Sequence, residues 1–509
     1  MFKPNSLFYS DGYKIGHKRM LAKGTTRLYG TWIPRSTKHA PKGVNKIVSF
    51  GQQLVVKWLH DEFEQNFFAL SEDAAVKFGN DMSLYLGMEY DASHFADLHK
   101  LGYLPIKIKA LPEGIETLPN IPHMTFINTV DGFAWLTLYL ETIISSLAWK
   151  PSTSATLALQ YKRNVVEWVM KTDPANAFLI PFLCHDFSAR GLSPWDMLSS
   201  GLGHASSFLG SDTIICIPAA RYYYNEPEDQ VAIYSVNASE HSVSTTKIFT
   251  VGEQQMIADW LTDFPKGILS IVSDTFDLWK LITEYLPANK ESIMSRDGKL
   301  VIRPDSGDPV DIICGKKWND IQNPYDENVD AAEKGVIELL WDIFGGTINE
   351  QGYKVLDPHI GAIYGDSITL DRQIQIYERL AAKGFASTNI VLGIGSYTYQ
   401  MNTRDTLGFA AKGAWFEVEQ PTFGEFADQN LNTEKVAYDI YKDPITDDGT
   451  KKSLKGLLQV VMEGNEYHVN TQCTWEQEDN SYLQTIYEEG RFCNETSLSD
   501  VRKKLGRLS

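Results

Sequence analysis

The sequence predicts an α/β protein in which an irregular (β/α) barrel-like domain is joined by an additional α+β domain formed by both chain ends. Three observations lead to this prediction. Short apolar runs alternate with amphipathic stretches across residues 151–409, the pattern of a parallel sheet covered by helices. Residues 1–150 mix helical and strand periodicities, and residues 410–509 return to strand patterns. We therefore expect residues 151–409 to form the barrel-like domain, and residues 1–150, completed by 410–509, to form the other.

The two ends of the chain contain clear local signals. Apolar residues at helical spacing between Leu54 and Phe63 predict a helix, and the alternation over residues 106–110 predicts a half-buried strand. Near the C-terminus, residues 457–462 and 466–469 flank a Gly464-Asn465 turn and predict a hairpin. These elements belong to the predicted α+β domain.

The middle of the chain repeats one arrangement, in which an apolar run ends in a polar or glycine-bearing cluster and a helical pattern follows. The predicted strands are residues 178–183, 268–272, 300–302, 360–363 and 390–392, and the predicted helices are residues 276–285, 331–344 and 368–382. Polar residues just beyond the carboxyl ends of parallel strands line the functional site in such folds. No GxGxxG follows an early strand, so a barrel is favoured over a dinucleotide-binding sheet.

Composition excludes several classes of protein. The 509 residues carry 47 basic and 65 acidic side chains, a net charge of −18, which argues against a nucleic-acid partner because phosphate backbones require basic surfaces. Five scattered cysteines without a CxxC indicate a reducing compartment. The apolar stretch from Trp135 to Trp149 is shorter than the roughly 20 residues of a membrane span and contains Glu141. We therefore expect a cytoplasmic protein with no membrane association and a buried helix in this stretch.

Four polar clusters at predicted strand ends are candidates for chemistry: His185–Gly191 (HDFSARG), Glu240-His241, Arg303–Gly307 (RPDSG) and Tyr364–Asp366. Each one alone also fits a helix N-cap, a turn or a structural histidine. Together they place carboxylates, arginines and glycine turns at one end of a barrel. That combination suits a polyhydroxylated, phosphorylated small molecule, because carboxylates accept from ribose hydroxyls and arginine forks bind phosphate. HExxH, GxxxxGK[ST] and GxSxG motifs are absent.

These motifs, in this order, resemble the nicotinamide phosphoribosyltransferases, a family of type II phosphoribosyltransferases. The resemblance runs nearly end to end. It is carried by Asp11–His17 (DGYKIGH), HDFSARG, Gly210–Thr213 (GSDT), Glu240–Ser242, Val272–Asp274, Ile302–Gly307, Gly365-Asp366, Thr403–Asp405 and Lys442–Pro444. It implies condensation of nicotinamide with 5-phosphoribosyl 1-pyrophosphate to nicotinamide mononucleotide and pyrophosphate, in a homodimer whose active sites lie at the interface.

The resemblance also implies roles for individual residues. Phe187 and a second subunit's Tyr13 are expected to stack on the nicotinamide ring, and Asp212 is expected to accept from its carboxamide. Other residues are expected to hold the base and ribose: Arg303, Asp305, Gly365 and Asp366. The phosphate and pyrophosphate groups are assigned to Gly395 and Ser396, to Arg404 and Lys412 across the dimer interface, and to Arg35, Arg190 and Lys442.

His241 resembles the histidine that ATP phosphorylates in this family, oriented by Glu240 or Asp274. We therefore take His241, Asp305, Asp274 and Glu240 as candidate catalytic residues, with ATP as a coupling co-substrate. Mg²⁺ on the pyrophosphate groups is the expected cofactor, and the sequence does not identify its ligands. Ser239 stands where the family commonly has alanine.

Two alternatives remain at this point. The first is a nicotinate phosphoribosyltransferase of the same fold, and Asp212 argues against it because a carboxylate repels the carboxylate of nicotinate. The second is a non-catalytic barrel-type binding protein. The phosphate-binding segment also departs from the family, which has a run of glycines where this chain has Gly393–Tyr397 (GIGSY).

Overall fold

The computed structural model describes residues 3–507 apart from residues 317–328, 366, 422–432 and 443–453. The chain divides into two compact units. Unit 1 comprises residues 1–156, 221–225 and 403–504, and unit 2 comprises residues 157–220, 226–402 and 505–509.

Unit 1 is built on a seven-stranded antiparallel sheet with the order β16-β15-β1-β5-β3-β19-β20. Its strands are β1 (Thr25–Ile33), β3 (Ile106–Ala110), β5 (Met124–Asn128), β15 (Ala410–Pro421), β16 (Thr433–Asp439), β19 (Gln484–Glu488) and β20 (Arg491–Phe492). Residues from both chain ends therefore share one sheet, because β1 pairs with β15 and β3 pairs with β19. The strand predicted for residues 106–110 is confirmed as β3.

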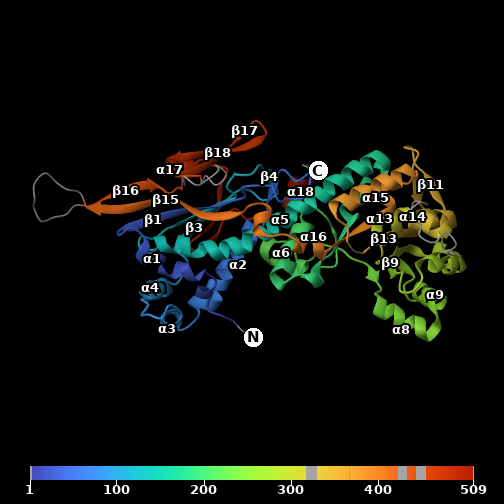
Figure 1. Ribbon diagram of the computed structural model, residues 1–509, viewed down its shortest axis with the longest axis horizontal. Helices are drawn as coiled ribbons and strands as arrows, with labels where there is room; N and C mark the ends of the chain where they lie inside the picture. The colour runs from blue at the N-terminus through green and yellow to red at the C-terminus, as the bar shows by residue number, and fades with distance from the viewer. Residues whose placement is uncertain (1–2, 317–328, 366, 422–432, 443–453, 508–509) are drawn as a thin grey trace, which may run out of the picture. The chain divides into compact units, whose positions relative to one another are not determined.

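Helices and a hairpin cover the two faces of this sheet. Figure 1 shows α1 to α4 on one side and the β17–β18 hairpin with α17 on the other. Tyr29 and Trp415 of the sheet pack against Leu457 and Leu458 of the hairpin in a buried cluster. The bounds are α1 (His17–Met20), α2 (Gln52–Phe63), α3 (Ala74–Leu86), α4 (Ser93–Leu101), β17 (Leu457–Glu463), β18 (Glu466–Cys473) and α17 (Trp475–Asp479), with a small β2–β4 pair (Ile47–Ser49 and Ile115–Thr117) and α18 (Leu498–Gly506). The predicted helix between Leu54 and Phe63 and the predicted hairpin are confirmed.

Helix α5 (Ala134–Thr172) is 39 residues long, so the helix expected from Trp135 to Trp149 is confirmed and extends further. Its residues Trp135, Leu136, Leu140 and Ile144 are buried. No helix in the described part of the chain is both long and apolar enough to cross a membrane.

Unit 2 contains a seven-stranded parallel sheet with the order β7-β6-β14-β13-β10-β9-β8. The sheet curls into an incomplete barrel, which confirms the predicted (β/α) barrel-like fold. Strand β13 is buried along its whole length, as expected of a strand covered on both faces. The strands are β6 (Cys184–Phe187), β7 (Gly210–Ser211), β8 (Asn237–Ala238), β9 (Lys266–Val272), β10 (Asp297–Arg303), β13 (Ile360–Tyr364) and β14 (Ile390–Gly395).

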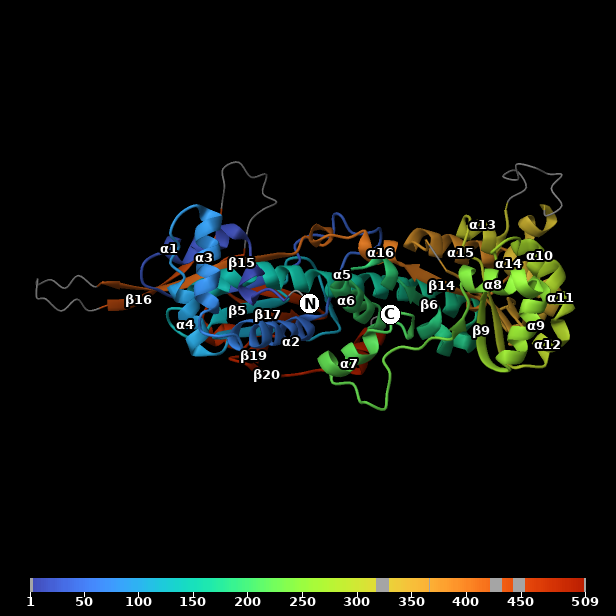
Figure 2. The same cartoon turned by 90° about the horizontal axis from the view of Figure 1, so that it is seen from below.

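Helices surround this sheet (Figure 2). In α15, buried residues recur at helical spacing (Leu370, Gln373, Ile376, Tyr377 and Leu380), and the Thr369 side chain caps the first turn. The bounds are α6 (Pro194–Ala205), α7 (Cys216–Tyr224), α8 (His241–Val251), α9 (Glu253–Asp263), α10 (Leu278–Lys280), α11 (Leu286–Ala288), α12 (Lys290–Met294), α13 (Pro309–Cys314), α14 (Val329–Phe344), α15 (Leu370–Ala382) and α16 (Ser396–Gln400), with a small β11–β12 pair (Gly346–Ile348 and Lys354–Leu356).

One predicted strand is wrong. The apolar run at residues 178–183 falls largely in a 3₁₀ segment, Pro174–Phe182, and the strand begins at Cys184, inside the HDFSARG motif. Pro181 has no backbone N–H to donate to a ladder, and Phe178 is 71% exposed rather than buried. Parallel pairing with β14 therefore starts only at Cys184, opposite Leu392.

Candidate active site

A cavity of about 530 Å³ lies at the carboxyl ends of the parallel strands in unit 2. Ten of its twelve lining residues are predicted site residues. They are Phe187, Arg190, Asp212, Glu240, His241, Arg303, Asp305, Gly365, Gly395 and Ser396, accompanied by Ala189 and Ser242. The structure therefore brings together residues that are as far as 209 positions apart in sequence, from Phe187 to Ser396.

Two glycines allow the strand ends to approach closely at this cavity. A Cβ atom at Gly393 would lie 2.8 Å from the Phe187 ring and 2.6 Å from the Tyr364 carbonyl oxygen, and a Cβ at Gly365 would lie 2.5 Å from Oδ1 of Asp305. Phe187 and Gly395 are register partners in the β6–β14 pair. The aromatic ring and the predicted phosphate-binding segment are thus set side by side by the strand register.

Asp212 is held by two side chains. His185 Nε2 lies 2.9 Å from Asp212 Oδ1, and the Ser235 hydroxyl donates to the same oxygen. Burial alone would raise the pKa of Asp212, but these hydrogen bonds, the charge of His185 and the charge of Arg303 lower it below its usual value. Asp212 Oδ1 therefore already accepts two hydrogen bonds, and the carboxylate is ionised at neutral pH.

Arg303 and Asp305 follow strand β10. The guanidinium carbon of Arg303 lies 6.0 Å from the centroid of the Phe187 ring, and Arg303 Nη2 donates to the Ser239 carbonyl. Asp274 Oδ2 accepts from the backbone N–H groups of Asp305 and Ser306, at 2.8 and 2.7 Å. Asp274 thus fixes the loop that carries Asp305, and its own side chain is only 8% exposed.

His241 is the first residue of α8. Its Nδ1 lies 3.2 Å from the Thr275 hydroxyl, and its Nε2 lies 3.8 Å from Asp274 Oδ1 and 3.9 Å from Asp305 Oδ2. Of the two carboxylates expected to orient the ring, Asp274 lies near it. Glu240 instead accepts from Ser242, at 2.7 Å, so the expectation for Glu240 is not met in this structure.

The remaining predicted residues gather in unit 1. Tyr13 is 68% exposed; partial burial and the charges of Asp11 and Glu141 raise the pKa of its hydroxyl, and the charge of Arg404 lowers it. Burial lowers the pKa of Lys412, and the like charges of Arg35, Lys442 and Arg404 lower it further. Lys412 therefore lies close to three other cations, with Glu141 partly opposing their effect, and this arrangement suits a phosphorylated ligand.

Three residues that contact the cavity lining were missed or given no role in the sequence analysis. His185 belongs to the HDFSARG motif, so its contact with Asp212 could have been suspected from the motif. Ser235 and Thr275 carry no sequence signal and reach Asp212 and His241 only through the fold. Asp366 lies outside the described residues.

The carboxylates at the cavity can be compared with what the expected Mg²⁺ would need as ligands. Among the described residues, no group of three or more His, Cys, Asp or Glu side chains is arranged to hold an ion. The cavity nevertheless offers the half-exposed carboxylate of Asp305. Magnesium is commonly bound through one or two carboxylates together with substrate phosphates, so this donor set fits magnesium brought by a phosphorylated substrate.

Known proteins similar to this chain identify its family. A family model described as the nicotinate phosphoribosyltransferase (NAPRTase) family matches residues 182–491. The chain belongs to this family. It is 40% identical to a nicotinamide phosphoribosyltransferase of Acinetobacter baylyi over 99% of this chain and 98% of that one, and 32% identical to one of Mycoplasma pneumoniae over 88% and 94%.

Solved structures agree on the fold. A nicotinate-nucleotide pyrophosphorylase from Pyrococcus furiosus has a TM-score of 0.52 at 14% identity, covering 99% of this chain and 94% of that one. Human nicotinic acid phosphoribosyltransferase has a TM-score of 0.51 at 14% identity, covering 98% and 93%. At this level of identity the likeness concerns the fold alone.

Proposed function

We propose that this chain is a nicotinamide phosphoribosyltransferase, which condenses nicotinamide with 5-phosphoribosyl 1-pyrophosphate to nicotinamide mononucleotide and pyrophosphate. The observation that carries the choice of nicotinamide is the ionised Asp212, whose Oδ1 is engaged by His185 and Ser235. Its other oxygen can accept from a carboxamide N–H, whereas a nicotinate carboxylate beside it would be repelled. The names of relatives that match over most of their length support the same choice.

The reaction needs positioning and charge stabilisation more than proton transfer. The pyridine nitrogen already carries a lone pair; it forms the bond to C1′ of the ribose as the bond from C1′ to the pyrophosphate oxygen breaks. Phe187 would hold the ring, and Asp305 would stabilise the positive charge that develops on the ribose. Arg190 would bind the departing pyrophosphate. Bound magnesium, held by the phosphates and Asp305, would neutralise charge on the leaving group.

We also propose that ATP hydrolysis is coupled through His241. We assign the ring proton to Nδ1, which then donates to Thr275 and leaves the lone pair on Nε2, 3.8 Å from Asp274 Oδ1 and 3.9 Å from Asp305 Oδ2. Nε2 would attack the γ-phosphorus of ATP, so that an N–P bond forms while the bond to the ADP oxygen breaks. The phosphoryl group would then add charge beside the pyrophosphate site and change substrate affinity.

The active protein is proposed to be a homodimer in which a second copy supplies Tyr13, Arg404 and Lys412 to each cavity. The cationic residues of unit 1 support this proposal, because Arg35, Lys442 and Arg404 act on Lys412 as like charges, an environment that suits the phosphate groups of the substrate.

The test is a product assay with nicotinamide and nicotinate side by side, each with and without ATP. We expect the mononucleotide from nicotinamide, stimulated by ATP, and little product from nicotinate. Equal use of nicotinate would favour the nicotinate enzyme of the same fold. No product from either substrate would favour a non-catalytic binding protein.

A further inference from the structure

Glu141 is an acidic residue in the apolar first half of α5, and unit 1 surrounds it with cationic and N–H groups. Its side chain is 15% exposed, and its Oε2 lies 2.6 Å from Nζ of Lys14, whose side chain is 3% exposed. Lys14 also donates to the Leu138 carbonyl at 2.7 Å. The Lys14 charge is buried and the Glu141 charge is mostly removed from water, and such a pair needs excellent geometry to be tolerated.

The ion pair is part of a row of contacts that fastens the N-terminal segment to one turn of α5. Ser10 donates to the Tyr139 carbonyl at 3.1 Å, and Thr142 donates to Asp11 Oδ2 at 2.6 Å. Of the three N-terminal side chains in this row (Ser10, Asp11 and Lys14), only that of Lys14 is buried. Tyr13 lies next to it with its ring exposed, 5.6 Å from the Lys14 ammonium. The position of the Tyr13 ring therefore depends on how Lys14 is held.

Glu141 also reaches strand β15. Burial raises the pKa of Glu141, and this rise is opposed by Lys14, by the Gly413 backbone N–H and by the charge of Lys412. A Cβ atom at Gly413 would lie 3.5 Å from Leu138 Cδ2, so the strand passes directly over this turn of α5. One carboxylate thus contacts the segment that carries Tyr13 and the strand that carries Lys412.

We propose that Glu141 is a positioning residue that sets the Tyr13 ring and the Lys412 amino group relative to each other. This inference rests on the proposed function, in which Tyr13 contacts nicotinamide and Lys412 contacts phosphate. Glu141 itself touches no substrate. It holds the two groups that do, and a neutral side chain in its place would remove the charge that pairs with Lys14 and attracts Lys412.

The test is Glu141→Gln in the full-length enzyme. Glutamine keeps an oxygen that can accept from Gly413 and removes the charge that pairs with Lys14. We expect KM to rise about 10- to 100-fold for both nicotinamide and phosphoribosyl pyrophosphate, with a smaller change in kcat, because misplaced binding groups cost on this order. Amide hydrogen exchange of residues 11–16 should become faster, a readout that does not depend on activity.

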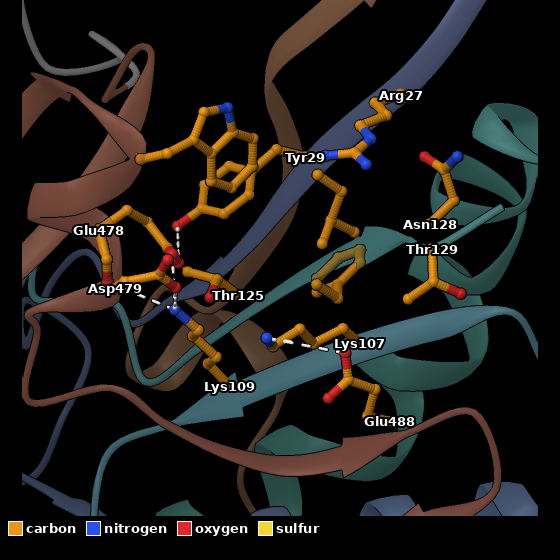
Figure 3. Close-up of a pocket in the computed structure, with 13 residues that line it drawn as sticks. Arg27, Tyr29, Lys107, Lys109, Thr125, Asn128, Thr129, Glu478, Asp479 and Glu488 are labelled. Carbon is orange, nitrogen blue, oxygen red and sulfur yellow. Dashed lines mark hydrogen bonds and ion pairs between the residues drawn. The ribbon is translucent and has the colours of Figure 1, made fainter. Parts of the chain in front are cut away.

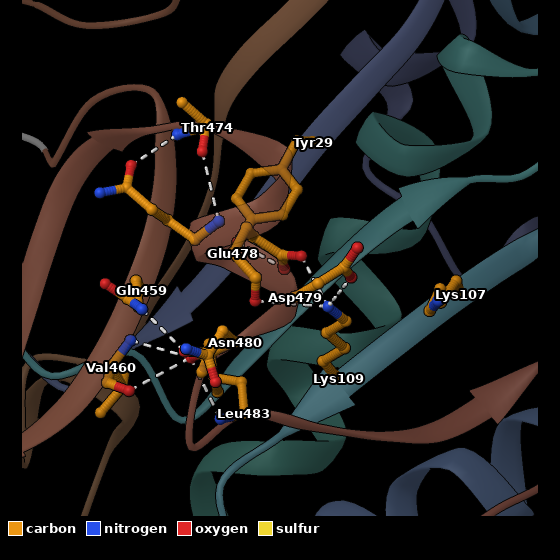
Figure 4. A network of polar contacts seen from close by, with 12 residues as sticks. Tyr29, Lys107, Lys109, Gln459, Val460, Thr474, Glu478, Asp479, Asn480 and Leu483 are labelled. Atoms are coloured by element: carbon orange, nitrogen blue, oxygen red, sulfur yellow. Dashed lines mark hydrogen bonds and ion pairs between the residues drawn. The ribbon is translucent and has the colours of Figure 1, made fainter.

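Another buried ion pair of unit 1 supplies the matched control. Lys109 Nζ lies 2.6 Å from Glu478 Oε2, with side chains 8% and 3% exposed (Figure 3). This pair lies in a network with Asp479 and Tyr29 that contains none of the predicted site residues (Figure 4). Glu478→Gln should lose stability as Glu141→Gln does, yet leave both KM values and the exchange of residues 11–16 unchanged.

The outcomes are separable. Wild-type KM values and unchanged exchange in Glu141→Gln, with only a loss of stability like that of Glu478→Gln, would overturn the inference. If wild-type enzyme does not use nicotinamide, the proposed function fails, while the exchange measurement still reports whether Glu141 holds the segment. If Glu141→Gln does not fold, the double variant with Lys14→Met, which leaves no unpaired buried charge, is judged by the same KM and exchange criteria.

Discussion

His185 Nε2 and Asp212 Oδ1 lie 2.9 Å apart at the ends of neighbouring parallel strands, so a histidine within the HDFSARG motif fixes one oxygen of the carboxylate proposed to select the substrate. The strand register explains the contact, since His185 pairs with Gly210, two residues before Asp212. A Cβ atom at Gly210 would lie only 2.9 Å from Nδ1 of His185, so a glycine at this position leaves room for the imidazole ring.

Asp212→Asn tests the choice of substrate. Losing a charge-assisted hydrogen bond costs on the order of 1.5–3 kcal/mol, so kcat/KM for nicotinamide should fall about 10- to 100-fold. The amide can donate to a carboxylate, so discrimination against nicotinate should weaken. Steady-state kinetics with both substrates measure this, and an unchanged preference would contradict the role given to Asp212.

His185 should act on substrate binding only through Asp212. His185→Leu removes the N–H donor and should raise KM for nicotinamide, whereas His185→Gln keeps a donor and should retain most of the affinity. KM for phosphoribosyl pyrophosphate should stay near the wild-type value in both. If leucine and glutamine behave alike, the hydrogen bond does not position Asp212.

The proposed phosphorylation of His241 predicts different results for variants of two adjacent residues. His241→Ala should abolish ATP hydrolysis and the acid-labile label from γ-labelled ATP, while slow ATP-independent transfer persists. Glu240→Gln is the matched control, because Glu240 binds Ser242 rather than the imidazole. It should still be labelled. Equal labelling of His241→Ala and wild type would show that another residue accepts the phosphoryl group.

A site completed by a second copy can be tested by mixing two inactive variants. Tyr13→Ala and Asp305→Ala alter residues in unit 1 and unit 2, respectively. In a heterodimer, one cavity would carry both lesions and the other neither, so activity should return to up to half the wild-type value per dimer. Verified heterodimers without any activity would contradict an interfacial site.

His123 should make unit 1 sensitive to acid. It is buried, with Nε2 2.8 Å from the Thr117 hydroxyl, and burial lowers its pKa to about 3. In the unfolded chain His123 binds a proton below about pH 6.5, whereas in the folded chain it does so only below about pH 3. The contribution of His123 to stability is therefore full above pH 6.5 and falls by about 1.4 kcal/mol per pH unit below it. Denaturant midpoints from pH 7 to 4 should show a shallower decline in His123→Gln, and an identical slope would refute the assignment.

Local pattern was sufficient for much of the fold. The apolar runs that became β9, β10, β13 and β14 are continuous because both faces of a parallel strand are largely covered, completely so in β13, and they are therefore visible without the structure. The strand predicted for residues 178–183 is wrong because the hydrophobic pattern takes no account of Pro181, which has no backbone N–H for a sheet hydrogen bond. The motifs likewise indicated most of the cavity lining, since the residues just after parallel strands share one edge of the sheet.

What the sequence could not determine is which of these residues face one another. Glu240 is adjacent to His241 in the chain, yet its carboxylate binds Ser242, while Asp274 and Thr275 reach the imidazole from the end of β9. Glu141 is visible in the sequence only as a charge in an apolar helix, and its partners Lys14 and Gly413 are more than 120 residues away on either side. Composition and periodicity determine the elements and the kind of chemistry, because both depend on local residue types. Strand register and helix packing determine the partners, because contacts between distant residues exist only once the chain has folded.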